Sequence, residues 1–459
     1  MCRWSAIGRG ITAARLLAAV LLTPAFAAHA STRPHYGGTL HVETQADPWQ
    51  SPDSLGRRLI FDSLTRVDSS GALQPALAAR WKSQNGDHRW QFWLRPGVHL
   101  HDGSPLTPDS VQQSLERSCT QCPWTSVRTL GDSLVFTTAS SDPVLPEQLA
   151  RSQYAIASQD ASGNPVGTGA FRFVSNVNYV LSLAAVDDAW QGRPFVDTIE
   201  ITGRRTVRTQ WLDLIAGRAD IVDVPVESMR EAQQEHIAIV QSNNCDLLVL
   251  SISHNGVLAD DAQREAMALA VDRASLYSVI FQKQGEMTAS LLPNALTGYS
   301  FLFPVTRDLA QAQQLRGAGS SAPLTLMVED TNAAVQLAAE RLALNLREAG
   351  FHLQIVTRNA NATAGSSAPD LQLKRIHLEA GSTQAALEQM LAAFNQPLTD
   401  ESADPAALYR EEASFARLHQ ALPLLYLPRA VGVGSRVQGL RLSADGMPLL
   451  ADVSLADTK

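Results

Sequence analysis

The sequence predicts a mixed α/β fold, because segments with the two-residue period of a strand alternate with segments that have the period of a helix. Residues 88–94 alternate, with Trp90 and Phe92 on one face, which is typical of a half-buried strand. Residues 247–252 form a short, continuous apolar run of the kind found in a buried strand. Residues 324–356 have the pattern strand, helix, strand, so these two strands should be parallel, with a right-handed crossover.

A helix should follow the first of these strands after two tight turns. Thr107 can cap its start, Pro108 suits the first helical position, and Asp109 meets the positive end of the helix dipole. Val111 and Leu115 lie four residues apart and should form the buried stripe of this helix.

The other predicted elements follow from the same periodicities. They are strands at 36–42, 180–185, 196–201, 370–377 and 422–428, and helices at 210–216, 260–271 and 273–282.

The N-terminus has the pattern of a secretory signal peptide. Three arginines lie in the first 15 residues, a short apolar run follows at 16–22, and small residues near positions 25–30 offer cleavage sites. The apolar run is too short to span a bilayer. We therefore expect residues 1–30 to be removed on export through the general route, which leaves the mature chain in the periplasm.

Composition limits the possible partners. The 459 residues are 45% hydrophobic and 18% charged, an ordinary globular balance for a chain of two or three domains. The net charge is −8, and removing the three arginines of residues 1–30 makes it −11. An acidic surface without basic clusters argues against nucleic acid as a partner.

Residues 73–115 resemble the signature region of the family 5 extracellular solute-binding proteins, the periplasmic oligopeptide- and dipeptide-binding proteins of ABC importers. The matching residues occur in the order of the family pattern: Pro75-Ala76-Leu77-Ala78, Trp81, Phe92, Leu94-Arg95-Pro96-Gly97-Val98, His101-Asp102-Gly103 and Leu106-Thr107-Pro108-Asp109-Ser110-Val111. Ser110 stands where the family usually has Asp. Further similarities lie at residues 37–40, 167–173, 187–194 and 437–440.

The resemblance implies a two-lobed periplasmic-binding-protein fold of type II, in the large cluster that carries an extra subdomain in lobe 1. By this resemblance lobe 1 comprises residues 31–250, with the extra subdomain at about 60–160. Lobe 2 comprises residues 251–425, and residues 426–459 return to lobe 1.

The implied function is capture of a peptide, or another small solute, in the cleft between the lobes, and its delivery to an ABC permease in the inner membrane. We expect a monomer that needs no cofactor or metal and is not an enzyme. The chain has no Gly-x-Ser-x-Gly or His-Glu-x-x-His motif, and its eleven histidines are scattered. Two other functions stay open: a binding fold that acts as a sensor or interaction module, and, as the least favoured, a hydrolase.

Candidate ligand contacts come from departures from the family pattern and from loop aromatics. Residues 374–381 replace the family's Trp-x-x-Asp-Tyr-x-Asp-Pro-like stretch, which leaves Arg375 and Glu379 as candidate contacts. By resemblance, Glu379 could anchor a peptide amino terminus, or it could be a solvated loop acid. Trp49 and Trp124 are candidates for a pocket wall, and packing is an equal alternative for each.

The cysteines suggest one disulfide. Cys119 and Cys122 are separated by two residues, and in an exported protein a local disulfide is favoured over zinc, because zinc would need a second pair of ligands. A redox site is the alternative, without the surrounding βαβ pattern that it needs. Cys245 should be a buried thiol.

Overall fold

The computed structural model describes residues 35–119, 122–317, 322–330, 332–357, 368–400 and 403–456. The contacts divide the chain into two units, Met1–Arg33 and Pro34–Lys459, and all described elements belong to the second unit. The predicted signal peptide at residues 1–30 lies outside the described residues. Among the described residues, no helix has the length and apolar character needed to cross a membrane.

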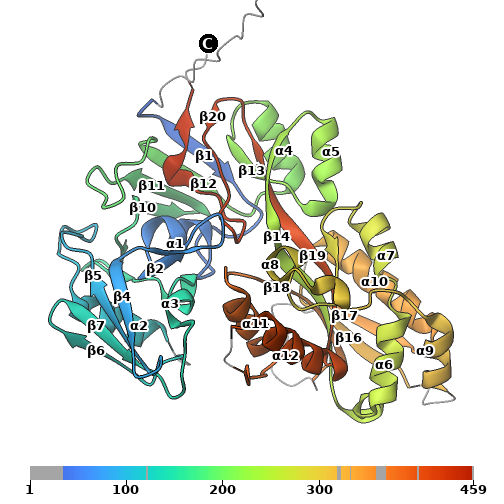
Figure 1. The fold of residues 1–459 in the computed structure, drawn as a ribbon. Coiled ribbons are helices and arrows are strands. Elements are labelled where there is room, and N and C mark those ends of the chain that lie inside the picture. Colours follow the sequence, from blue (N-terminus) through green and yellow to red (C-terminus); the bar gives the residue numbers. More distant parts are fainter. Residues whose placement is uncertain are drawn as a thin grey trace, which may run out of the picture. The chain divides into compact units, whose positions relative to one another are not determined.

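One sheet of eleven strands forms the centre of the described unit (Figure 1). Its order is β10-β11-β12-β1-β13-β19-β14-β18-β16-β17, and β15 also pairs with β19. The strands on one side are β10 (Phe171–Val177), β11 (Val180–Ala185), β12 (Thr198–Thr202), β1 (Thr39–Glu43) and β13 (Ile221–Asp223). The strands on the other side are β18 (Leu371–His377), β16 (Leu324–Val328), β17 (Leu353–Thr357) and β15 (Glu286–Met287). We call the parts built on these two groups the first half and the second half.

Two long antiparallel strands, β14 (Ala238–Ile252) and β19 (Ala421–Val433), connect the halves. β19 pairs with β13 in the first half, and β14 pairs with β18 in the second half. The side chains of residues 247–250 are fully buried, as expected for a central strand that is covered on both faces. The prediction of a buried strand at 247–252 is confirmed.

The second half contains the predicted βαβ unit. β16 and β17 are parallel and are joined by α10 (Ala333–Glu348), whose first N–H groups are capped by the Asn332 side chain. Leu342 and Leu346 of α10 are fully buried in the core of this half. The 3.6-residue period of the helix therefore supplies the apolar face that covers the parallel strands.

The remaining helices are shorter. Those of the first half are α1 (Leu55–Ile60), α3 (Leu145–Gln148), α4 (Val207–Ile215) and α5 (Met229–Gln234). Those of the second half are α6 (Asp261–Ala270), α7 (Arg273–Ser275), α8 (Asn294–Thr297), α9 (Leu309–Arg316), α11 (Thr383–Ala392) and α12 (Pro405–Arg417). The helix predicted at 273–282 is only partly α-helical, because a π-helical turn at Leu276–Ile280 follows α7. Helices α11 and α12 were not predicted.

A separate four-stranded sheet lies in the first half, in the order β4 (Ala78–Gln84), β5 (Arg89–Leu94), β7 (Ser133–Thr137) and β6 (Ser126–Leu130). Trp90 and Phe92 of β5 are buried against α2 (Pro108–Ser118), and Thr107 caps that helix. Both local predictions are confirmed. Three two-stranded sheets complete the unit: β2 (Thr65–Val67) with β3 (Leu73–Pro75), β8 (Ser158–Gln159) with β9 (Pro165–Val166), and β20 (Val437–Gln438) with β21 (Ser454–Leu455).

The Gly167-Thr168-Gly169 motif brings two backbone segments together. A Cβ atom at Gly167 would lie 2.0 Å from the carbonyl oxygen of Ile60, and one at Gly169 would lie 2.3 Å from that of Leu59. Real side chains do not tolerate such distances. Glycine is therefore required here to pack the chain against the end of α1.

Candidate ligand-binding site

A cavity of about 1150 Å³ lies between the two halves. Its walls come from residues 42–48, 51, 53–55 and 221–228 of the first half, and from Glu329, Asp330, Asn332, Ala333, Arg375 and His377 of the second half. The crossing strand β19 contributes residues 428–431. This volume is slightly above the range of about 300–1,000 Å³ that is usual for small-molecule sites.

The lining of this cavity is strongly acidic. Eight acidic side chains among the described residues line it, against the three basic side chains of Arg375, His377 and Arg429. The acidic residues are Glu43, Asp47, Asp53, Asp223, Glu227, Asp246, Glu329 and Asp330. The site therefore differs from an apolar pocket, and its charge should decide which solutes enter it.

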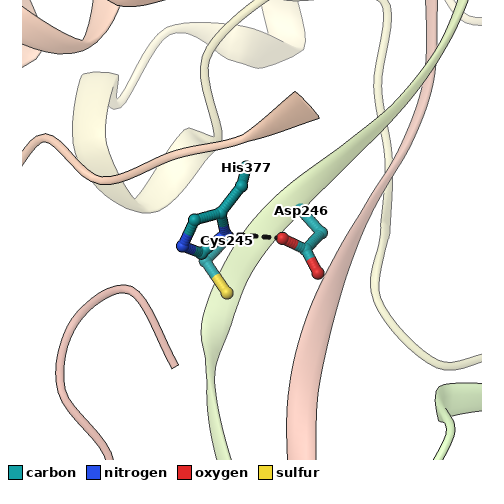
Figure 2. Close-up of side chains that lie close together, drawn as sticks. All are labelled: Cys245, Asp246 and His377. Atoms are coloured by element: carbon teal, nitrogen blue, oxygen red, sulfur yellow. Dashed lines mark hydrogen bonds and ion pairs between the residues drawn. The ribbon is translucent and has the colours of Figure 1, made fainter. Parts of the chain in front are cut away.

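A buried ion-pair network centred on Asp246 forms part of the cavity wall. His377 Nδ1 lies 2.7 Å from Asp246 Oδ1 (Figure 2). Arg429 Nε donates to Asp246 Oδ2 at 3.0 Å. Strand pairing creates this contact, because Asp246 of β14 lies directly opposite His377 of β18. Two cationic side chains thus share one carboxylate that is only 9% exposed.

The network fixes the charge of each member. Burial by itself lowers the pKa of His377, but the hydrogen bond to Asp246 and the nearby carboxylate of Asp445 outweigh it and raise this pKa to about 11. Burial by itself would raise the pKa of Asp246, but the hydrogen bond from His377 and the charge of Arg429 hold it well below its usual range. His377 is therefore an imidazolium at neutral pH.

The network continues into the first half. His377 Nε2 lies 3.9 Å from Asp445 Oδ2, and Arg58 Nη1 of α1 donates to that oxygen at 2.5 Å. The positive charges of His377 and Arg58 hold the pKa of Asp445 well below its usual range, against the opposing effect of burial. Alternating charges therefore link α1 to the strands that cross between the halves.

Cys245, Asp246 and His377 are a group in which thiol, carboxylate and imidazole atoms lie within 4.8 Å of one another (Figure 2). This donor set suits a transition metal. Metal binding requires a neutral imidazole, however, and the pKa of His377 near 11 keeps the ring protonated. Both oxygens of Asp246 already accept hydrogen bonds. The geometry fits an ion-pair network better than a metal centre.

Comparison with known proteins gives this cavity a family context. Residues 72–400 match the family described as "Bacterial extracellular solute-binding proteins, family 5 Middle". The chain belongs to this family. The family 5 resemblance predicted from the motifs is confirmed, and family 5 members are binding proteins rather than enzymes.

Family 5 relatives differ in what their names say they bind. The nickel-binding protein NikA of Staphylococcus aureus is 26% identical over 235 residues, which is 48% of each chain. The oligopeptide-binding protein AppA of Bacillus subtilis is 23% identical over 291 residues, which is 56% of this chain and 54% of AppA. The chain thus spans about half the length of these curated relatives.

Solved structures of family 5 proteins match the fold. NikA of Staphylococcus aureus, solved with Ni(L-His)2, superposes with a TM-score of 0.78 at 18% identity, covering 91% of this chain and 100% of NikA. DppA of Helicobacter pylori, solved with the peptide STSA, gives 0.79 at 18% identity, covering 92% and 99%. The predicted α/β fold of the family is confirmed.

The residues predicted as ligand contacts lie in different places. Arg375 lines the cavity and forms an ion pair with Asp330, whereas Trp49, Trp124 and Glu379 are not part of its lining. The Trp124 ring is 7% exposed and packs edge-on against a core phenylalanine. The positions of these last three residues give no support for a ligand contact.

Trp49 and Glu379 have other partners instead. Trp49 packs between Phe61 and Phe173, with ring centroids at 6.1 Å and 6.2 Å. Glu379 lies 3.7 Å from Arg58 and accepts a hydrogen bond from Ser152 Oγ at 3.2 Å. These contacts belong to the packing of the first half and to its junction with the second half.

The structure joins Cys119 and Cys122 through a disulfide directly after α2, and Cys245 is a free, buried cysteine. Sequence reasoning missed Asp246 and Asp223 as members of the cavity wall. The only signal in the sequence was an acidic residue directly beside each of two apolar strands, at positions 246 and 223.

Proposed function

We propose that this chain is a periplasmic substrate-binding protein of an ABC importer that captures a peptide in the cleft and delivers it to a permease in the inner membrane. The cavity of about 1150 Å³ between the halves carries this proposal, because it has the size and the two-sided lining that an extended ligand needs. Family membership and a related fold solved with a bound peptide support it.

The proposal includes two lobes, residues 31–250 and 251–425, with residues 426–459 returning to the first. The two connecting strands, β14 and β19, are suited to act as a hinge about which the lobes open and close over a ligand. A closed form would bury the peptide and present both lobes to the permease.

A titration of the purified protein with a pool of short peptides tests this function. Isothermal titration calorimetry should show heat of binding, and the apparent Tm should rise, because a ligand that binds only the folded state stabilises it. Free amino acids at the same concentration are the control without an extended main chain. Neither heat nor a thermal shift with any peptide would contradict peptide capture.

A nickel complex is the second candidate, since the lining of the cavity is strongly acidic and a related structure was solved with Ni(L-His)2. Ni²⁺ with L-histidine therefore forms a second arm of the same titration. If binding is seen only with Ni²⁺ and L-histidine, the captured solute is a metal complex and not a peptide.

One contact between the halves should control closure. Glu147 of α3 accepts backbone hydrogen bonds from Gly381 at 2.5 Å and from Ser382 at 2.7 Å, at the start of α11. A carboxylate at a helix N-terminus forms charge-assisted hydrogen bonds, each worth about 1.5–3 kcal/mol. Glu147→Ala should therefore weaken ligand binding by at least about tenfold, measured by the same calorimetry.

The matched control for this variant is Glu116→Ala, because within the described part of the chain the Glu116 carboxylate bonds to Gln112 of its own helix and to no residue of the second half. It should leave the affinity unchanged. Equal affinities for Glu147→Ala and the unmodified protein would show that this contact is not part of closure.

A further inference from the structure

We propose that the cleft selects positively charged peptides and that the Asp223 carboxylate receives an ammonium group of the ligand. This inference rests on the proposed function of peptide capture and names the charge of the substrate. It follows from which charges in the cavity are already neutralised by the protein and which are not.

The protein neutralises part of the acidic lining itself. Asp246 is shared by Arg429 and His377, Asp330 pairs with Arg375, and the remaining described ion pairs of the lining involve arginines outside the cavity. Those arginines are Arg205, 3.4 Å from Glu43, and Arg204, 3.7 Å from Asp47. All three basic side chains of the lining are thus already engaged with carboxylates.

Three carboxylates of the lining are left without such a partner. Among the residues that the structure describes, Asp53, Asp223 and Glu227 line the cavity but form no ion pair with a basic side chain. Their hydrogen bonds come from neutral donors, such as Ser51 to Asp53 and Asn332 to Glu227. Neutralising these three carboxylates therefore requires positive charge, which a bound ligand can supply.

Asp223 is the most constrained of the three. It is the last residue of β13, its Oδ2 accepts the Gln45 N–H at 2.6 Å, and its own N–H donates to Gln210 Oε1 at 2.7 Å. These bonds hold the carboxylate in place without neutralising it. Burial raises the pKa of Asp223, so an ammonium group that paired with it would stabilise the ionised form.

The same charges couple binding to closure. Glu227 of the first half accepts a hydrogen bond from Asn332 Nδ2 of the second half at 2.9 Å, so the two walls of the cavity are in contact at this point. Glu329 lies on the second wall, next to Asp330, which is already paired with Arg375. Like charges on facing walls repel, and a cation between them removes this repulsion. A cationic peptide should therefore stabilise the closed arrangement more than an anionic peptide does.

Calorimetry with matched tripeptides tests the inference. We expect Lys-Ala-Lys to bind at least about tenfold more tightly than Glu-Ala-Glu, with Ala-Ala-Ala between them, and the difference should shrink as salt is added. N-acetylated Lys-Ala-Lys identifies the source of the ammonium group. If acetylation abolishes binding, the group that pairs with Asp223 is the α-amino group of the peptide. If binding is retained, the group is a lysine side chain.

Asp223→Asn should weaken Lys-Ala-Lys about tenfold and change Ala-Ala-Ala less, while Asp223→Glu should keep the preference for the cationic peptide. Asp188→Asn, at an exposed turn outside the cavity, is the matched control and should have no effect. Thermal unfolding of each variant shows that it is folded.

The outcomes separate the inference from the function on which it rests. If none of the peptides binds, peptide capture itself fails. If peptides bind with equal affinity, or the acidic one binds best, capture stands and the charge preference is overturned. Unchanged affinity of Asp223→Asn for Lys-Ala-Lys would overturn the role of that residue.

Discussion

Replacing Asp246 with asparagine should lower the free energy of unfolding by about 3–5 kcal/mol, the usual effect of removing one partner from a buried ion pair. Asp246 is 9% exposed and is the shared counterion of His377 and Arg429. The variant leaves two neighbouring cations in a buried site without a negative charge between them. Chemical denaturation followed by circular dichroism should show a clearly lower midpoint for Asp246→Asn.

Asp187→Asn provides the control with the same chemical change. Asp187 also pairs with an arginine, Arg193, at 2.7 Å, but its side chain is 86% exposed. Water already solvates this pair, so its loss should hardly move the midpoint. Similar midpoints for the two variants would show that burial of the Asp246 network does not contribute to stability.

Local sequence patterns predicted the local structure well. The alternation in β5, the capped start of α2 and the βαβ unit around α10 all depend on residues within a few turns of one another, and all three are present. Periodicity reports which face of an element is buried, and burial is decided largely by that element's own side chains. The family motifs likewise lie in continuous stretches.

The binding cavity could not be predicted in the same way, because it is assembled by strand register over long sequence distances. Asp246 and His377 are 131 residues apart, and only the pairing of β14 with β18 makes them neighbours. Trp124 shows the reverse case. It lies in a loop, and loop aromatics are reasonable candidates for a pocket wall, yet its ring is covered by Phe136 and Tyr154. Neither the pairing of Asp246 with His377 nor the packing of Trp124 can be read from the local sequence.

A second large effect should depend on pH. Burial, with the negative charge of Glu388 as the next cause, raises the pKa of Asp142 from 3.8 to about 7. Between these two values the folded state holds a proton that the unfolded state has released, so stability falls as the pH rises from about 4 to about 7. Asp142→Asn removes this titration. At pH 8 it should stabilise the protein by about 2–4 kcal/mol, and at pH 4 by close to nothing.

Apparent Tm values of both proteins between pH 4 and pH 8 measure this effect. Asp68→Asn is the control of opposite sign, because hydrogen bonds from Ser70 and Ala72 lower the pKa of Asp68 to about 2. The folded-state contribution of Asp68 is present above about 4 and is lost only as the pH falls toward 2, so its replacement should destabilise the protein slightly at pH 8. A constant difference between Asp142→Asn and the unmodified protein at every pH would contradict the assignment.

The position of Asp142 gives this titration a further consequence. Asp142 precedes α3 in the first half, whereas Glu388 belongs to α11 of the second half. The repulsion between their carboxylates therefore acts across the same junction that Glu147 closes with its hydrogen bonds to Gly381 and Ser382. Separation of the halves would solvate both acids. Asp142→Asn should thus favour the closed arrangement at pH 8, and ligand affinity should rise together with the apparent Tm.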